Sequence, residues 1–227
     1  KNKPAAPPPI TISSFTEFAL SFISPSKLVY LLYRLLKLAG RLGIRIFCRR
    51  IDINNPVALK SDGPLLIACN HPNSFLDAVI LDILFDIPVY SLARGDAFVS
   101  PFVSRILYSL KILPVYRTSE GVENLMDNYK TFNACIDLFK KNGAVLIFSE
   151  GLCVNEWKLR PLKKGTARLA YKCREENIPL KILPVAINYS SFRLFGKNVL
   201  INFGNSFYPS ELVNGSEGAF NTAFNRQ

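Results

Sequence analysis

The chain has 227 residues, of which 49% are hydrophobic and 20% charged, and its formal net charge is +11 at pH 7. This composition suits one globular domain with ample apolar material for a core, and it excludes a largely disordered chain. Five cysteines at scattered spacings and a single histidine argue against a disulfide framework and against a zinc site, so we expect no bound metal.

The first fifty residues divide into a tail and two helices. Residues 1–14 are rich in Pro, Ala and Lys, which predicts a flexible tail. A helical stretch around Phe15 to Ile23 stops at Pro25, and a second helix runs from about Lys27 to Cys48. We therefore expect an amphipathic, membrane-associating helical pair over residues 15–50.

The second helix has a purely cationic face. At 100° per residue its basic side chains fall within one arc, and leucines fill a broad sector away from it. A packed helix with a solvated charged face fits this pattern, and so does a helix lying in an anionic membrane interface. The lack of acidic residues favours the interface, because helices built for solubility usually mix both signs. The predicted membrane-binding residues are Lys27, Arg34, Lys37, Arg41 and Arg45.

Strands and helices alternate over residues 51–210, which predicts an α/β fold with a largely parallel mixed sheet flanked by helices. No stretch reaches 18 uncharged apolar residues, so no transmembrane helix is predicted. Residues 211–227 are expected to form a polar C-terminal tail that could be truncated. Strands are predicted at Leu65 to Cys69, Val89 to Ala93, Pro114 to Tyr116, Ala144 to Ser149, Lys181 to Asn188 and Val199 to Phe203. Helices are predicted at Ser74 to Phe85, Pro101 to Leu110, Gly121 to Lys141 and Lys164 to Glu176.

The only histidine directly follows a predicted buried strand, in the segment NHPNSFLD. That is the sheet edge where such folds keep their ligand sites. His71 can take a proton from a hydroxyl nucleophile, and Asp77 on its other ring nitrogen would fix the tautomer. Ser74-x-x-Asp77 also fits a capping box that only closes the first helical turn, and this segment alone leaves both interpretations open.

Three further segments join NHPNSFLD in an order that resembles the glycerolipid acyltransferases, the superfamily of lysophosphatidic acid and glycerol-3-phosphate acyltransferases. NHPNSFLD resembles the first block, LARGDAF and LPVYRTSEG the second, IFSEG the third and ILPVAINY the fourth. The order is specific, although each motif alone is weak. Two departures stand out: five residues separate His71 from Asp77 where four are usual, and Leu152-Cys153 replaces the frequent Thr-Arg.

The resemblance implies His71 as general base and Asp77 as its orienting partner. Arg117 would bind the phosphate or another anionic head group of the acceptor, which suits a guanidinium that forms two parallel hydrogen bonds. A salt-bridged surface role for Arg117 and a solvated one for Lys163 are the alternatives. The expected substrate-binding residues are Asn70, Arg94, Arg117, Glu150, Gly151 and Lys163.

The resemblance thus implies a membrane-associated O-acyltransferase with its catalytic domain at residues 51–210. It would move a fatty acyl chain from acyl-CoA or acyl carrier protein to a hydroxyl of a lysophospholipid, glycerol phosphate or related polar lipid, in membrane lipid biosynthesis. A hydroxyl of an amino-acid-containing lipid is an equally compatible acceptor. No cofactor is expected to be bound. The expected partners are an anionic membrane surface, the lipid acceptor and acyl carrier protein, with the protein peripheral on the cytoplasmic face of a membrane.

A non-catalytic basic protein that binds lipid or nucleic acid is the competing interpretation. Nucleic-acid binding would require a recognised motif or aromatic residues interleaved with Lys and Arg outside a core helix, and neither is present. An α/β hydrolase would need a G-x-S-x-G elbow and a late histidine. A family member that only binds lipid would have lost His71 or Asp77, and both are present.

Overall fold

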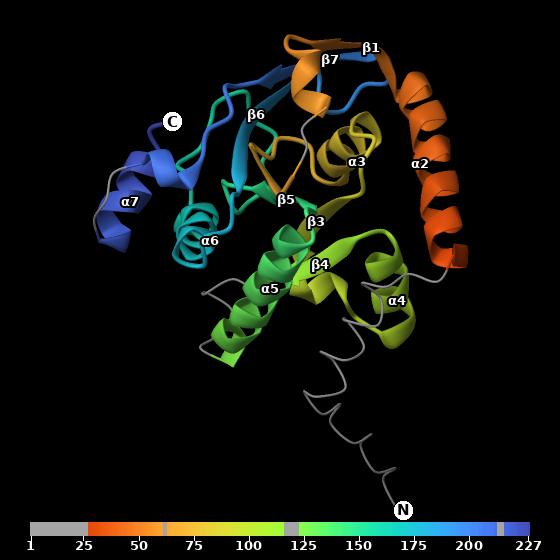
Figure 1. Cartoon of the computed structure of the whole chain (residues 1–227). Helices are drawn as coiled ribbons and strands as arrows, with labels where there is room; N and C mark the ends of the chain where they lie inside the picture. The colour runs from red at the N-terminus through yellow and green to blue at the C-terminus, as the bar shows by residue number, and fades with distance from the viewer. Residues whose placement is uncertain (1–26, 61–62, 116–122, 213–215) are drawn as a thin grey trace, which may run out of the picture.

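The computed structural model describes residues 27–60, 63–115, 123–212 and 216–227. Its centre is a seven-stranded sheet in the order β1-β7-β6-β2-β5-β3-β4 (Figure 1). Neighbouring strands are parallel except β6 and β7, so the predicted largely parallel mixed sheet is confirmed. The strands are β1 (Cys48–Ile53), β2 (Leu65–Cys69), β3 (Val89–Arg94), β4 (Ile112–Val115), β5 (Ala144–Phe148), β6 (Lys181–Tyr189) and β7 (Lys197–Phe203).

Helices cover both faces of the sheet, and each face has its own apolar core (Figure 1). One core lies between the sheet and α3, with α2 packed outside α3, and the other lies between the sheet and α5, α6 and α7. The α-helices are α2 (Lys27–Phe47), α3 (Phe75–Leu84), α4 (Pro101–Ser109), α5 (Glu123–Lys140), α6 (Lys164–Glu175) and α7 (Glu217–Phe224). Three short 3-10 helices are η1 (Pro56–Lys60), η2 (Gly95–Ala97) and η4 (Pro209–Glu211).

Strands β2 and β5 are nearly continuous apolar runs, as expected for parallel strands buried on both faces. They are adjacent, with Cys69 opposite Phe148 in the register. Since β3, β5, β2 and β6 run in the same direction, their carboxyl ends meet at one edge of the sheet. The loops that follow these strands are thereby brought together from distant parts of the chain.

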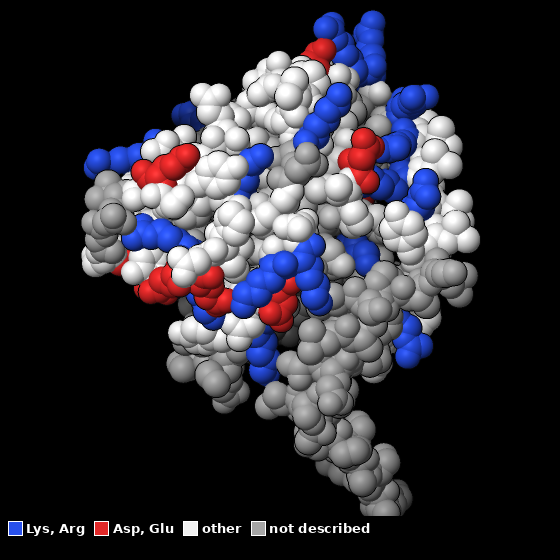
Figure 2. Space-filling model, viewed as in Figure 1, with Lys and Arg blue, Asp and Glu red and all other residues white. Residues whose placement is uncertain are grey.

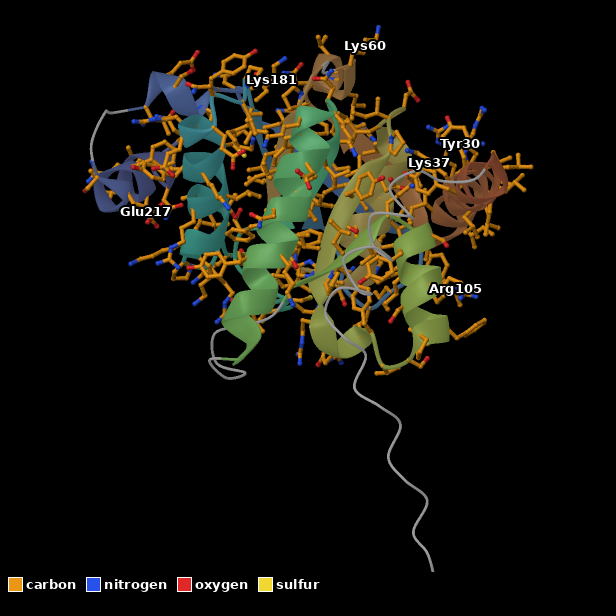
Figure 3. All side chains as sticks on the ribbon, turned by 60° about the horizontal axis from the view of Figure 1, so that its bottom comes forward. Tyr30, Lys37, Lys60, Arg105, Lys181 and Glu217 are labelled. Atoms are coloured by element: carbon orange, nitrogen blue, oxygen red, sulfur yellow. The ribbon has the colours of Figure 1, made fainter. Side chains whose placement is uncertain are left out.

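Part of the cationic face of helix α2 turns toward the protein and not toward solvent. Tyr33 and Ile44 are buried, the Lys37 ammonium donates to the Ile87 carbonyl at 3.2 Å, and the Arg41 guanidinium donates to the Ile83 carbonyl at 2.9 Å. Two of the five predicted membrane-binding cations therefore bind the protein's own backbone. Figure 3 shows Lys37 on the side of α2 that faces the rest of the molecule.

The outward side of α2 is apolar. Figure 2 shows Lys and Arg between α2 and the body of the molecule, with uncharged side chains along the outer edge. Arg34 and Arg45 are exposed, whereas the side chain of Lys27 lies outside those that the structure describes. Within the described ranges, no helix combines the length and apolar character needed to cross a bilayer. The exposed apolar residues of α2 are Tyr30, Leu31, Leu32, Leu35, Leu36, Leu38, Leu42, Ile46 and Phe47.

Two further expectations need correction. Residues 48–53 form strand β1, which pairs parallel with β7 about 150 residues later, so residues 48–50, expected in the helical pair, belong to the sheet. Residues 217–224 form α7, which buries Phe220 and Phe224 against α6 where we expected a polar tail. The helix predicted around Phe15 to Ile23 lies outside the described residues.

Candidate active site

The loops after β2, β5 and β3 surround an open groove of about 1580 Å³ at the carboxyl edge of the sheet. His71 follows β2, Gly151 follows β5, and Arg94 ends β3, and all three line this groove. The fold therefore brings together residues from the first, second and third blocks.

His71 and Asp77 form a hydrogen-bonded pair, with 3.0 Å between His71 Nδ1 and Asp77 Oδ2. An ionised carboxylate only accepts hydrogen bonds, so Nδ1 carries the proton. Nε2 is then the unprotonated ring nitrogen, available as a base to a molecule in the groove. The ring stacks on Phe148 with 3.7 Å between centroids, which limits its rotation. The geometry is that of a histidine prepared to accept a proton.

Asp77 is fully buried and accepts hydrogen bonds from three groups. Its Oδ2 also accepts from the Asn73 backbone N–H at 2.7 Å, and its Oδ1 accepts from the Tyr189 hydroxyl at 2.5 Å. These bonds offset the desolvation cost that an isolated buried carboxylate would carry. Asp77 therefore orients the histidine from a fixed position.

The structure separates the two interpretations of Ser74-x-x-Asp77. Ser74 occupies the N-cap position of α3 but makes no capping hydrogen bond through its side chain, and its φ is 50°. Neither half of a capping box is present, because Asp77 accepts from the Asn73 N–H, while the N–H of Ser74 itself donates to Cys153 Sγ. Asp77 both closes the turn and binds His71, so it ties the ring to the start of α3.

Glu150 is buried beside this pair and holds the backbone of two loops. Its Oε2 accepts from the His71 backbone N–H at 3.2 Å, and its Oε1 accepts from the Arg160 backbone N–H at 3.0 Å. The structure shows Glu150 as a residue that positions the histidine loop. Its predicted contact with the acceptor stays a prediction.

The segment after β5, residues 151–163, crosses the histidine loop and is bonded to it. The Asn155 side chain donates to the Pro72 carbonyl at 2.7 Å, and the Ser74 backbone N–H donates to Cys153 Sγ at 3.0 Å. The Val154 N–H also donates to the His71 carbonyl at 3.2 Å. The unusual Leu152-Cys153 sequence of the third block therefore lies directly against the catalytic candidates.

The Asn70 side chain binds the backbone of β6. Its side-chain amide donates to the Ile187 carbonyl at 3.0 Å and accepts from the Ile187 N–H at 2.8 Å. It thereby extends the pairing between β2 and β6 by one residue past the end of β2. The structure thus gives Asn70 a role in joining β2 to β6, and its predicted contact with substrate stays a prediction.

Three other predicted substrate-binding residues, Arg94, Gly151 and Lys163, line the groove. Arg94 forms an ion pair with Asp96, and both line the groove. Gly151 has a φ of 64°, and a Cβ there would lie 3.0 Å from Lys163 Cγ, so glycine lets the Lys163 side chain cross it closely. Arg117 lies outside the described residues.

The sequence analysis did not identify Tyr189. Burial and the nearby Asp77 carboxylate raise the pKa of Tyr189 above its ordinary value, so its hydroxyl remains a proton donor. Two features of the sequence could have pointed to Tyr189. It ends the motif ILPVAINY, and the alternation along β6 buries it on the same side as Val185 and Ile187. The target of its hydroxyl could not be read from these signals, because Asp77 lies 112 positions away.

A largely parallel α/β sheet with a histidine–carboxylate pair at an edge groove is the arrangement of an enzyme in which histidine transfers a proton. Residues 50–188, more than half of the chain, match the acyltransferase family, and the chain belongs to that family. A chloroplastic 1-acyl-sn-glycerol-3-phosphate acyltransferase from Brassica napus is 28% identical over 123 residues, which cover 54% of this chain and 34% of that protein. The chain thus matches about a third of the length of this curated relative.

The fold also has a counterpart among solved structures. The 1-acyl-sn-glycerophosphate (LPA) acyltransferase PlsC from Thermotoga maritima superposes with a TM-score of 0.61 and 15% identity, covering 91% of this chain and 82% of that chain. This likeness extends beyond the family match at both ends, and it supports the fold described above.

Proposed function

We propose that this protein is an O-acyltransferase that moves a fatty acyl chain from a thioester donor, acyl-CoA or acyl carrier protein, to a hydroxyl of a polar lipid. A lysophospholipid is the acceptor suggested by the name of the Brassica relative, and glycerol phosphate or an amino-acid-containing lipid with a hydroxyl is the alternative. The observation that carries the proposal is the 3.0 Å contact between His71 Nδ1 and buried Asp77 at the groove.

The reaction follows from that geometry. His71 Nε2 removes the proton of the acceptor hydroxyl as its oxygen attacks the thioester carbonyl carbon. Positive charge develops on the His71 imidazolium, where the Asp77 carboxylate stabilises it, while negative charge develops on the thioester carbonyl oxygen. When the tetrahedral intermediate collapses, the carbon–sulfur bond breaks and the thiol leaves with the proton from His71. An ester and a free thiol are the products.

The groove has an apolar wall and a basic wall, which could hold an acyl chain and a charged group side by side. Its lining from α3, β3 and β4 is mainly apolar and includes Phe75, Leu92 and Ile112. Its lining from the start of α6 is basic and includes Lys163 and Lys164. An apolar wall can bury the fatty chain, while the lysines can attract a phosphate or carboxylate of donor or acceptor.

Helix α2 supports the proposal that the protein works peripherally at a membrane. Its outward leucines form an apolar stripe that water would solvate poorly, whereas a lipid interface would bury it. Exposed Arg34 and Arg45 border that stripe and can approach anionic head groups. The membrane contact proposed here is thus chiefly apolar, with two of the five expected cations beside it.

Replacing the two members of the pair tests the reaction. His71→Ala should abolish acyl transfer to lysophosphatidate, and Asp77→Asn should lower kcat by about 10³–10⁴-fold because the tautomer is no longer fixed. Transfer from radiolabelled acyl-CoA and from acyl carrier protein is measured with purified protein in detergent, and circular dichroism verifies the fold. A folded His71→Ala variant with full activity would contradict the mechanism.

A further inference from the structure

The hydroxyl of Tyr189 makes the shortest contact to Asp77 among its three hydrogen-bond donors, at 2.5 Å. It reaches Oδ1, the oxygen that His71 and Asn73 do not use. Tyr189 is 2% exposed, so water cannot replace this bond. His71, Asp77 and Tyr189 thus form one continuous chain of hydrogen bonds from the groove into the core.

The ring and backbone of Tyr189 are themselves fixed from other elements. As the last residue of β6 it pairs with Val199 of β7, and its carbonyl accepts from the Trp157 indole N–H at 2.6 Å. The ammonium of buried Lys197 lies 5.7 Å from the centre of its ring, and donates to the Phe192 carbonyl at 2.7 Å. Because these contacts fix the Tyr189 hydroxyl, its hydrogen bond also fixes the orientation of the Asp77 carboxylate.

We propose that Tyr189 is a positioning residue for acyl transfer, which holds the Asp77 carboxylate in the orientation that lets His71 act as base. This inference rests on the acyltransferase function proposed above. Without the hydroxyl, Asp77 Oδ1 is left in the core without a donor, and the carboxylate can rotate away from His71 Nδ1 to seek one. The imidazolium formed during attack would then be less well stabilised.

Tyr189→Phe removes only the hydroxyl and tests the role. We expect kcat to fall about 10-fold, the order of one charge-assisted hydrogen bond, while KM for donor and acceptor changes less than about twofold. A purely structural role would instead reduce the amount of folded protein and leave kcat per folded molecule unchanged. An unchanged kcat would overturn the proposal.

Tyr33→Phe is the matched control. Tyr33 is also buried and donates to a carboxylate of α3 at 2.5 Å, but that carboxylate belongs to Asp82 and does not contact His71. Tyr33→Phe should lower the free energy of unfolding about as much as Tyr189→Phe does. With a short, water-soluble donor, its kcat should stay within about twofold of wild type. Equal losses of kcat in both variants would assign the effect to general loosening of α3.

A double variant tests whether Tyr189 acts through Asp77. In an Asp77→Asn background, adding Tyr189→Phe should change kcat by less than about twofold, because the carboxylate that Tyr189 positions is gone. A further 10-fold loss in that background would show a separate role and overturn the proposal.

A spectroscopic readout keeps this test independent of the substrate. The chain has one histidine, so ¹⁵N-histidine labelling gives the signals of His71 alone. The ring N–H should exchange with water faster in Tyr189→Phe than in wild type or Tyr33→Phe. Wild type that fails to transfer acyl groups would refute the proposed function, whereas active wild type with unchanged exchange and kcat in Tyr189→Phe would refute only this inference.

Discussion

His71 contacts α3 through Asp77, β5 through Phe148 and the 151–163 segment through Val154, and the end of β6 contacts Asp77 in turn. Most of them fix the backbone or the carboxylate and leave Nε2 to the groove. Cys69, at the end of β2, is buried, and burial raises the pKa of its thiol well above the ordinary value. Around the histidine, therefore, apolar packing and two buried carboxylates fix its place: Asp77 binds the ring and Glu150 binds the backbone.

Cys153 provides a residue-scale probe of the groove. Of the five cysteines, the other four are buried, while Cys153 is partly exposed and lines the groove beside Ser74. Iodoacetamide should therefore label Cys153 first and block acyl transfer by filling the groove. Burial raises the pKa of this thiol, so less reactive thiolate is present at neutral pH and the labelling rate should rise steadily from pH 7 to 9. Peptide mass spectrometry locates the label.

The control for this labelling is Cys153→Ser. A serine oxygen can still accept the Ser74 N–H, so activity should stay within about threefold of wild type and become insensitive to the reagent. Inactivation of Cys153→Ser at the wild-type rate would show that another site is responsible.

At the scale of elements, α2 has two chemically different sides. Its inner side carries the Tyr33–Asp82 hydrogen bond and the Lys37–Asp82 ion pair, which fasten it to α3. Burial opposes charge on Lys37 and lowers the pKa of its ammonium, an effect that Asp82 partly offsets. These contacts fix the rotation of the helix and so present the leucines outward.

The outward side predicts how the protein binds vesicles. Changing Leu35, Leu38 and Leu42 to Ser should weaken binding by about 100-fold or more on neutral and anionic vesicles alike, because burial of three leucines is lost. Co-sedimentation with vesicles measures this effect. Val57→Ser, at an even more exposed apolar residue on η1, should leave vesicle binding unchanged.

Charge reversal separates the apolar contribution from the electrostatic one. Arg34→Glu with Arg45→Glu should weaken binding to anionic vesicles only, since each cation near such a surface contributes about 1 kcal/mol. If the leucine variant bound vesicles like wild type, α2 would not be the membrane contact.

At the scale of the whole molecule, the C-terminal helix completes the second core. Phe220 is fully buried in α7, packs edge-on to Tyr171 with 5.3 Å between ring centres, and lies near Arg174 of α6. Residues of α6 and Glu217 of α7 line the same groove as His71. The C-terminal segment therefore supports one wall of the candidate site.

Phe220→Ala should lower the free energy of unfolding by about 3–5 kcal/mol, through lost burial and a cavity between α6 and α7. Urea denaturation followed by circular dichroism measures the loss. Glu217→Gln on the same helix breaks only the exposed ion pair with Arg168, so its cost should stay below about 1 kcal/mol. A Phe220→Ala protein as stable as wild type would show that α7 contributes little to the fold.

Local patterns predicted the order of elements well. Apolar runs located β2, β5 and β6 within a residue or two, and amphipathic periodicity located α3, α5 and α6. Strand β1 was missed, since its sequence CRRIDI carries three charges and becomes a strand only by pairing with β7. Helix α7 was missed because its two buried phenylalanines stand among small and polar residues.

The sequence by itself determined the fold class, the place of His71 after a buried strand, and the family-like order of motifs, because each depends on residues close together in the chain. Tertiary structure alone decided that Asn70 pairs with Ile187, that Tyr189 reaches Asp77, and that α2 turns its leucines outward. A helical pattern shows that one side is apolar, but not whether that side meets the core or a lipid surface. Likewise, a polar side chain has many possible partners, and only the folded chain brings one of them within hydrogen-bonding distance.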